Sequence, residues 1–184
     1  MHAVNAKQQL RRKVFALKDS YPEKTLQAYA AEIYVRIEQS PFFREATRIA
    51  CYHALPGEVH TTIFLERWYV RKRIFLPAVD GEQLKFYPYQ GEKSLKTGAF
   101  GIMEPATDRD ETGDDLDLAI IPGVAFDRRM NRLGRGKGFY DRFLSTFRKP
   151  VIGICFHFQL FDVIPVDAYD CKMTQIITEQ ETIG

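Results

Sequence analysis

Residues 116–144 read LDLAIIPGVAFDRRMNRLGRGKGFYDRFL, and this segment decides the fold. Its first part, residues 116–124, is the short apolar run that a buried parallel strand requires. Its second part sets Gly134, Gly136 and Gly138 among basic residues and then opens a helix-like run. Glycine lets the backbone approach a ligand closely, and the amides at a helix start favour an anion. The segment therefore predicts a strand, a phosphate-binding loop and a helix in succession.

The glycine spacing matches neither of the well-known nucleotide motifs. No Ser or Thr follows Lys137, as a P-loop requires, and Phe139 stands where the last glycine of GxGxxG would be. On spacing alone, a basic surface turn between a strand and a helix remains an alternative. The loop follows a buried strand, however, and ligands gather beyond the carboxyl ends of strands in open α/β sheets. This placement favours a ligand-binding loop.

Strands and helices alternate on both sides of this segment. The apolar periodicity predicts helices at 3–17, 25–39, 61–72 and 138–147 and strands at 48–52, 74–79, 83–89, 116–121 and 150–156. This order predicts an α/β fold, a three-layer Rossmann-like sandwich with a mostly parallel sheet and helices on both faces. The acidic, turn-prone stretch 108–115 is interpreted as an exposed loop, so residues 1–184 are expected to form a single domain.

Composition excludes several classes of protein. The 26 Lys and Arg against 24 Asp and Glu give a formal net charge of +2, which counts against a general nucleic-acid coat. The three cysteines, Cys51, Cys155 and Cys171, form no CxxC pair, so we expect neither a disulfide framework nor a zinc knuckle. This use of cysteine leads us to expect a cytoplasmic location. No apolar run approaches the roughly 18 to 20 residues of a membrane span, and the N-terminus has no signal-peptide core.

Several acidic residues are candidates for the site. Asp141 falls in the first turn of the predicted helix, where a carboxylate either complements the helix dipole or binds Mg²⁺ beside a phosphate. Asp167 and Asp170 are ordinary loop acids unless the chain returns to that edge and one of them supplies a second ligand. Glu58, just after the predicted strand 48–52, either binds the amide or amino edge of a heterocycle or serves as the N-terminal charge of the next helix.

Two histidines flank Glu58 in the sequence. His53 precedes it by five residues and His60 follows it by two. Their spacing matches no HExxH or Cys/His zinc pattern, so we do not expect them to bind a metal.

At this point the motifs carry a family resemblance. The run PGVAFDRRMNRLGRGKGFYDRFL, residues 122–144, resembles the signature of the 5-formyltetrahydrofolate cyclo-ligases, also called methenyltetrahydrofolate synthetases. KQQLRR at 7–12 resembles the family's basic nucleotide-binding start, and LPGEVHT at 55–61 its substrate segment. KTGAFGIMEP at 96–105 resembles the middle motif and PVDAYDCKMTQIIT at 165–178 the closing motif. These segments span nearly the whole chain in family order.

The resemblance implies an ATP- and Mg²⁺-dependent ligase. It would close 5-formyltetrahydrofolate to 5,10-methenyltetrahydrofolate and release ADP and phosphate. Transfer of the γ-phosphoryl group to the formyl oxygen creates a good leaving group, which N10 then displaces. Positioning and cationic stabilisation dominate such a transfer, so no covalent nucleophile is needed. We expect a monomer acting on a small-molecule substrate, with no nucleic-acid or membrane partner.

The family pattern also implies the site residues. It puts the γ-phosphate near the catalytic Arg135 and Lys137, Mg²⁺ on Asp141 and Asp170, and the folate against His53, Glu58 and Phe139. Glu104 either contributes to the site or is structural. ATP is assigned to the basic start of the chain and to the glycine loop, namely Lys7, Arg11, Arg132, Leu133, Gly134, Arg135, Gly136, Lys137, Gly138, Phe139 and Tyr140.

The chain departs from the family pattern at two positions. Asn131 stands where a glycine is common, but Asn also tolerates the left-handed conformation, so we expect the turn to survive. Tyr169 replaces a more usual polar neighbour of Asp170, which weakens the assignment of Asp170 to the metal.

Other functions are open at this stage. In a nucleic-acid-binding module the basic loop would grip phosphate while Phe139 and Tyr140 stack on bases. A catalytically silent relative would bind folate without turnover. The residues that argue against it are the intact Lys7, Arg132, Lys137 and Asp141.

Overall fold

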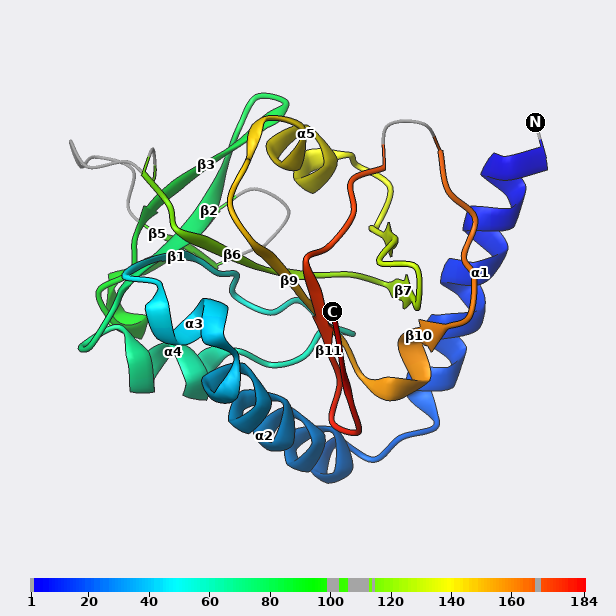
Figure 1. The fold of residues 1–184 in the computed structure, drawn as a ribbon, viewed down its shortest axis with the longest axis horizontal. Helices are drawn as coiled ribbons and strands as arrows, with labels where there is room; N and C mark the ends of the chain where they lie inside the picture. The colour runs from blue at the N-terminus through cyan, green and yellow to red at the C-terminus, as the bar shows by residue number, and fades with distance from the viewer. Residues whose placement is uncertain (1, 99–102, 106–112, 114, 168–169) are drawn as a thin grey trace.

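The protein, seen here as a computed structural model, is described for residues 2–98, 103–105, 113, 115–167 and 170–184 (Figure 1). Within these residues the main sheet has seven strands in the order β12-β11-β9-β6-β1-β2-β3. The strands are β1 Arg48–Ala50, β2 Arg73–Asp80, β3 Gln83–Pro88, β6 Leu118–Pro122, β9 Val151–Ile154, β11 Gln175–Ile177 and β12 Thr182–Ile183. The predicted strands thus lie in one sheet, and β11 and β12 extend it.

The centre of the sheet is parallel and both edges are antiparallel. Strand β1 pairs in parallel with β2 and β6, and β9 pairs in parallel with β6 and β11. The outermost strand at each edge is antiparallel to its neighbour, with β3 beside β2 and β12 beside β11. The central strand β6 is buried along its whole length, as its apolar sequence requires. The prediction of a mostly parallel sheet is confirmed.

Helices cover both faces of this sheet, which confirms the predicted sandwich (Figure 1). One face carries α2 (Glu23–Gln39), α3 (Pro41–Glu45) and α4 (Thr62–Trp68), and the other carries α5 (Phe139–Thr146). Separate apolar clusters fill the two sides, one centred on residues such as Ile33 and Phe64 and the other on Phe126 and Leu144. Helix α4 ends earlier than predicted, because Arg71 and Lys72 donate backbone hydrogen bonds to Trp68 in a turn.

A smaller sheet lies between the main sheet and α1 (His2–Asp19). It consists of β10 (Leu160–Phe161), β7 (Ala125–Asp127) and β8 (Arg132–Leu133). Val14 of α1 packs there in a buried cluster with Val124, Leu133 and Ile164. The β7–β8 hairpin separates β6 from the glycine loop, so the loop does not follow that strand directly as the sequence suggested.

Asp127 holds the turn of this hairpin. Its carboxylate is fully buried and accepts hydrogen bonds from the backbone of Arg129 and Asn131, the Asn131 side chain and the backbone of Ile164. The turn is preserved, as expected, but its left-handed residue is Met130, with φ 68°, and not Asn131. Asn131 is held by Asp127 instead, and the preceding residue makes the turn.

Another pair of short strands, β4 (Leu95–Thr97) and β5 (Met103–Pro105), forms a ribbon whose second strand packs against β2.

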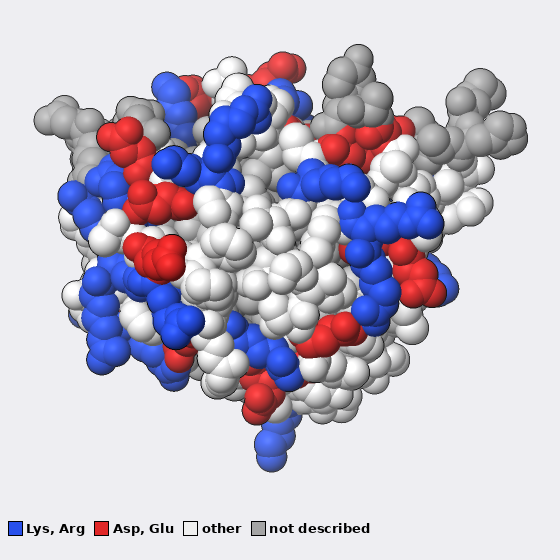
Figure 2. Space-filling model, viewed as in Figure 1, with Lys and Arg blue, Asp and Glu red and all other residues white. Residues whose placement is uncertain are grey.

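The predicted loop at 108–115 lies mostly outside the described residues, and Tyr169 lies wholly outside them. On the face seen in Figure 2, basic and acidic side chains alternate around a largely uncharged centre. Within the described part of the chain, no helix has the length and apolarity needed to cross a bilayer.

Candidate functional site

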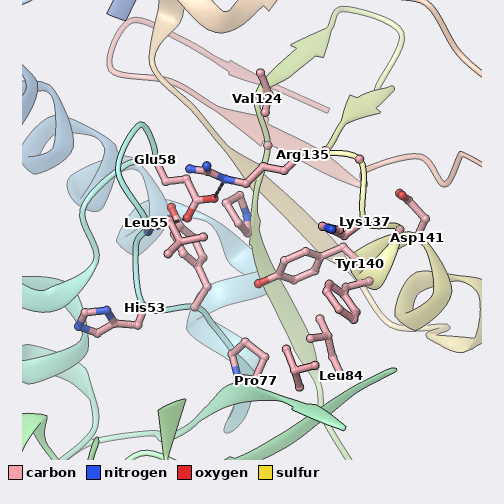
Figure 3. A pocket seen from close by; sticks show the side chains of 18 of the residues that line it. His53, Leu55, Glu58, Pro77, Leu84, Val124, Arg135, Lys137, Tyr140 and Asp141 are labelled. Atoms are coloured by element: carbon pink, nitrogen blue, oxygen red, sulfur yellow. Dashed lines mark hydrogen bonds and ion pairs between the residues drawn. The ribbon is translucent and has the colours of Figure 1, made fainter. Parts of the chain in front are cut away.

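A cavity of about 490 Å³ opens where the carboxyl ends of β1 and β6 meet the glycine loop (Figure 3). Its walls come from residues 52–58 after β1, the end of β6, and residues 132–141, and its floor includes side chains of β2 and β3. This is the sheet edge at which the sequence predicted a ligand site. The cavity brings together His53, Glu58, Arg132, Gly134, Arg135, Gly136, Lys137, Gly138, Phe139, Tyr140 and Asp141.

The glycine loop needs glycine for its backbone conformation. Gly136 has φ 104° and Gly138 φ 73°, in the region that other residues rarely adopt. Gly138 is also the N-cap of α5, so the unpaired amides of the first helical turn lie next to the loop. From outside the cavity, the Arg11 guanidinium donates to the Gly134 carbonyl at 2.8 Å. The loop is thus fixed on α1 at one end and on α5 at the other.

Arg132 lies beneath the loop as a buried cation. Its guanidinium is 4% exposed, pairs with the Asp141 carboxylate at 2.8 Å and donates to the Pro122 carbonyl at 3.1 Å. It also sits over the Tyr140 ring, 5.4 Å from the ring centre. Its Nε has no hydrogen-bond partner among the described residues. A buried guanidinium with a donor to spare suits a cavity that receives an anion.

Lys7 lies outside the cavity wall, between two carboxylates. Its ammonium is 2.7 Å from Asp167 and 2.6 Å from Asp170. Burial lowers the pKa of Lys7, but its hydrogen bonds to the two carboxylates outweigh burial and leave the pKa raised. Leu133 points into the cluster beneath α1 rather than into the cavity. The structure thus places Lys7, Leu133 and Asp170 behind the loop, and their assignment to ATP and metal stays a prediction.

Glu58 and Arg135 bridge the mouth of the cavity (Figure 3). Glu58 Oε1 lies 3.0 Å from Arg135 Nε, and Glu58 Oε2 accepts the Leu55 backbone N–H at 2.9 Å. Burial raises the pKa of Glu58 above its ordinary 4.5, although the Leu55 amide and Arg135 act in the opposite direction. His53 lies at the far end of the cavity, where burial lowers the pKa of its imidazole and favours the neutral form.

The raised pKa of Glu58 predicts a pH effect on stability. The folded protein holds the Glu58 proton more tightly than the unfolded chain, so this residue's contribution falls as pH rises from 4.5 through the raised pKa. The free energy of unfolding of Glu58→Gln, relative to wild type, should therefore increase between about pH 4 and pH 7. Urea unfolding at several pH values measures it. A relative stability that fell over this range would mean that the Arg135 ion pair outweighs burial.

The predicted magnesium ligands fit the ion's chemistry. Mg²⁺ usually takes one or two carboxylates together with phosphate oxygens and water. Burial raises the pKa of the Cys171 thiol, and the charges of Asp141 and Asp170 add to this rise. Among the described residues, no three ligating side chains gather into a cage. The donors suit an ion shared with a bound phosphate rather than an ion held by protein alone.

Sequence reasoning missed the floor of the cavity. Pro77 and Val79 share one face of β2, and Leu84 pairs with Val79 across the β2–β3 hairpin. Alternation along β2 was the available signal, because residues two apart in a strand face the same side. Glu104 is buried at this floor and accepts the Val79 N–H at 3.3 Å. Its carboxylate occupies the space that a Cβ on Gly98 would fill.

Comparison with known proteins places this cavity in a family context. The sequence profile described as the 5-formyltetrahydrofolate cyclo-ligase family matches residues 3–179. The 5-formyltetrahydrofolate cyclo-ligase of Haemophilus influenzae is 29% identical over 177 residues, 91% of each chain. That of Escherichia coli is 32% identical over 142 residues, 72% of this chain and 78% of the other. The solution structure of Aquifex aeolicus 5,10-methenyltetrahydrofolate synthetase superposes with a TM-score of 0.87 at 32% identity, covering 96% of this chain and 91% of the other.

Proposed function

The chain belongs to the 5-formyltetrahydrofolate cyclo-ligase family of ligases, and from this premise we propose its reaction and the roles of its residues. The reaction is the ATP-dependent closure of 5-formyltetrahydrofolate to 5,10-methenyltetrahydrofolate, with release of ADP and phosphate. One observation carries the proposal. A single cavity has a buried carboxylate, Glu58, on one wall and a glycine loop with Arg135 and Lys137 on the other. A heterocycle with amino and amide donors fits the first wall, and a phosphate chain fits the second.

The folate lies with its pterin against Glu58. The amino group and adjacent ring N–H of a pterin donate two hydrogen bonds in one plane, and a carboxylate accepts both. Pro77 and Leu84 supply an apolar floor for the ring. Neutral His53 borders this end, and Phe139 borders the other, beside the loop that carries the phosphate.

The phosphate chain of ATP lies along the glycine loop. The amides at the start of α5 and the cations Arg135, Lys137 and Arg132 face this part of the cavity. In the proposed reaction the formyl oxygen attacks the γ-phosphorus and ADP leaves. N10 then attacks the formyl carbon and gives up its proton to solvent, which closes the ring, and the phosphorylated oxygen departs as phosphate. The cations stabilise negative charge on the transferring oxygens in both steps.

Asp141 and Asp170 would hold Mg²⁺, as the chemistry of these donors allows. When bound, the ion supplies positive charge to the phosphate oxygens. Asp141 also neutralises the buried Arg132, and Lys7 neutralises Asp170. These ion pairs hold the two carboxylates in place beside the loop.

The reaction itself is the first test. Purified protein mixed with 5-formyltetrahydrofolate and Mg-ATP is expected to form methenyltetrahydrofolate, followed by its near-ultraviolet absorbance, with one phosphate released for each product. Omission of ATP should abolish product formation. A folded protein that binds ATP and forms no product would remove this substrate from the proposal.

A nucleic-acid-binding module is less well supported. Arg142 lies over the Phe139 ring at 5.3 Å and Arg132 over the Tyr140 ring, so one face of each ring is already covered by a cation. The mixed charges on the face in Figure 2 also differ from a continuous basic stripe.

We further propose that residues 1–184 act as a single monomeric domain. A cytoplasmic location stays a prediction from cysteine usage.

A further inference from the structure

One ion pair in the cavity ties together the two halves of the proposed site. Glu58 is the proposed folate ligand and Arg135 a proposed phosphate ligand, yet they bind each other at 3.0 Å. Building on the proposed function, we propose that this pair is an interlock that makes tight nucleotide binding depend on bound folate. The folate takes the place of Arg135 on Glu58, and Arg135 is then available to the phosphate chain.

The two partners are held very differently. The Glu58 side chain is 9% exposed, and its second oxygen is fixed by the Leu55 backbone N–H. The Arg135 side chain is 37% exposed and reaches from the loop to the Pro56 carbonyl and over the Phe15 ring. These contacts lie on the surface around the cavity mouth. Exchange of partners therefore moves the guanidinium and leaves the carboxylate where it is.

The difference in burial makes the exchange directional. A nucleotide that binds alone draws Arg135 away and leaves Glu58 buried without its cation, which is costly. A folate that binds alone replaces the Arg135 hydrogen bond on Glu58 and releases a half-exposed guanidinium into water, which costs little. Bound folate thus removes the free-energy cost of leaving Glu58 without its cation, a cost that lowers the affinity of the nucleotide when it binds alone. Because binding free energies are reciprocal, the nucleotide must also tighten folate binding by the same factor.

The loop backbone permits this movement. Arg135 is followed by Gly136 and Lys137 and then by Gly138, and both glycines have positive φ. Glycine passes between backbone conformations more freely than any other residue. On the outer side, Arg11 holds the carbonyl of Gly134. The segment that carries the guanidinium therefore lies between a residue held by Arg11 and two glycines.

The test measures nucleotide binding without turnover. The dissociation constant of Mg²⁺ with β,γ-imido-ATP is determined by calorimetry, with and without saturating 5-formyltetrahydrofolate. In the wild-type protein the folate should lower this constant by about tenfold. In Glu58→Gln the buried group is neutral and carries no penalty when Arg135 leaves. This variant should bind the analogue without folate about as tightly as wild type binds it with folate.

A matched control and a second variant complete the design. Glu38 pairs with Arg67 at 2.9 Å outside the cavity, so Glu38→Gln should leave the analogue's dissociation constant and its folate response unchanged. Should Glu58→Gln fail to fold, Arg135→Met tests the pair from its exposed side. In that variant folate should no longer change analogue affinity.

The outcomes separate the interlock from the proposed function. An unchanged folate-free affinity in Glu58→Gln, in a wild-type protein that converts its substrates, would overturn the interlock alone. A folate effect that persisted in Arg135→Met would do the same. A wild-type protein that binds neither folate nor the analogue would overturn the proposed function and the interlock together.

Discussion

Asp141→Asn is expected to lower the rate of ATP-dependent ring closure by roughly a thousandfold while the protein stays folded. Asp141 borders the cavity and is one of two carboxylates proposed to hold Mg²⁺ beside the phosphate chain. The amide removes the negative charge that the metal needs. Its oxygen still accepts the hydrogen bond from Arg132, which lies at 2.8 Å, so the buried guanidinium keeps a partner.

Asparagine is a sharper test at this position than alanine. Asp141→Ala would leave the Arg132 guanidinium, 4% exposed and with Nε already unpartnered, without its counter-charge. Breaking a buried ion pair in this way costs about 3–5 kcal/mol, so loss of activity in the alanine variant would be mixed with unfolding. A substitution at Asp141 thus bears on the fold as well as on the chemistry.

The measurement combines a rate with a stability. Initial rates at saturating substrates are compared with urea unfolding of the same samples, and Mg²⁺ is titrated in each. Asp80→Asn is the matched control, because that carboxylate is 60% exposed, forms an ion pair with Lys85 at 2.7 Å and lies outside the lining of the cavity. Wild-type activity in Asp141→Asn would remove Asp141 from the site.

Asp127→Ala is expected to lower the free energy of unfolding by about 4 kcal/mol. The Asp127 carboxylate is fully buried, and its removal leaves donors of Arg129, Asn131 and Ile164 without an acceptor. Each unsatisfied buried donor costs about 1–3 kcal/mol, and relaxation of the hairpin recovers part of the total. The glycine loop follows this hairpin, so its position should loosen too.

Asp162→Ala provides the comparison for this variant. The Asp162 side chain is 95% exposed and its nearest cation, Arg128, is 3.6 Å away, so its loss should change stability by less than about 0.5 kcal/mol. Urea or thermal unfolding measures both variants. Equal, small losses in the two would show that the hairpin does not depend on the buried carboxylate.

The fold was predictable where an apolar pattern repeats over several residues. Helices α1 and α2 and strands β2, β6 and β9 all follow clear apolar patterns, and each was predicted at nearly its observed position. The β7–β8 hairpin was not, because two- and three-residue strands are too short to show alternation. Its turn also hides its signal, since the left-handed residue is a methionine rather than a glycine.

The residues of the candidate site were predictable from local sequence motifs. The contacts between residues far apart in the chain were not. The glycine loop, His53, Glu58 and Asp141 border one cavity, as residues at the carboxyl ends of neighbouring parallel strands should. The partners of these groups could not be read from the sequence. Nothing in KQQLRR indicates that Lys7 binds Asp167 and Asp170. The motifs around Glu58 and Arg135 likewise do not indicate that these two residues bind each other. Such contacts depend on how loops approach one another after the sheet has formed.

The ion pairs of Lys7 also have a consequence for the order of events during synthesis. Lys7 contacts residues 160 and 163 positions later in the chain, so α1 finds these partners only when almost the entire polypeptide has left the ribosome. Contacts between such distant residues form late, because a long loop must close first. Until then the nascent chain carries a basic amphipathic helix with no acidic partner. The glycine loop therefore acquires its supporting helix as one of the last steps of folding, after the central strands are in place.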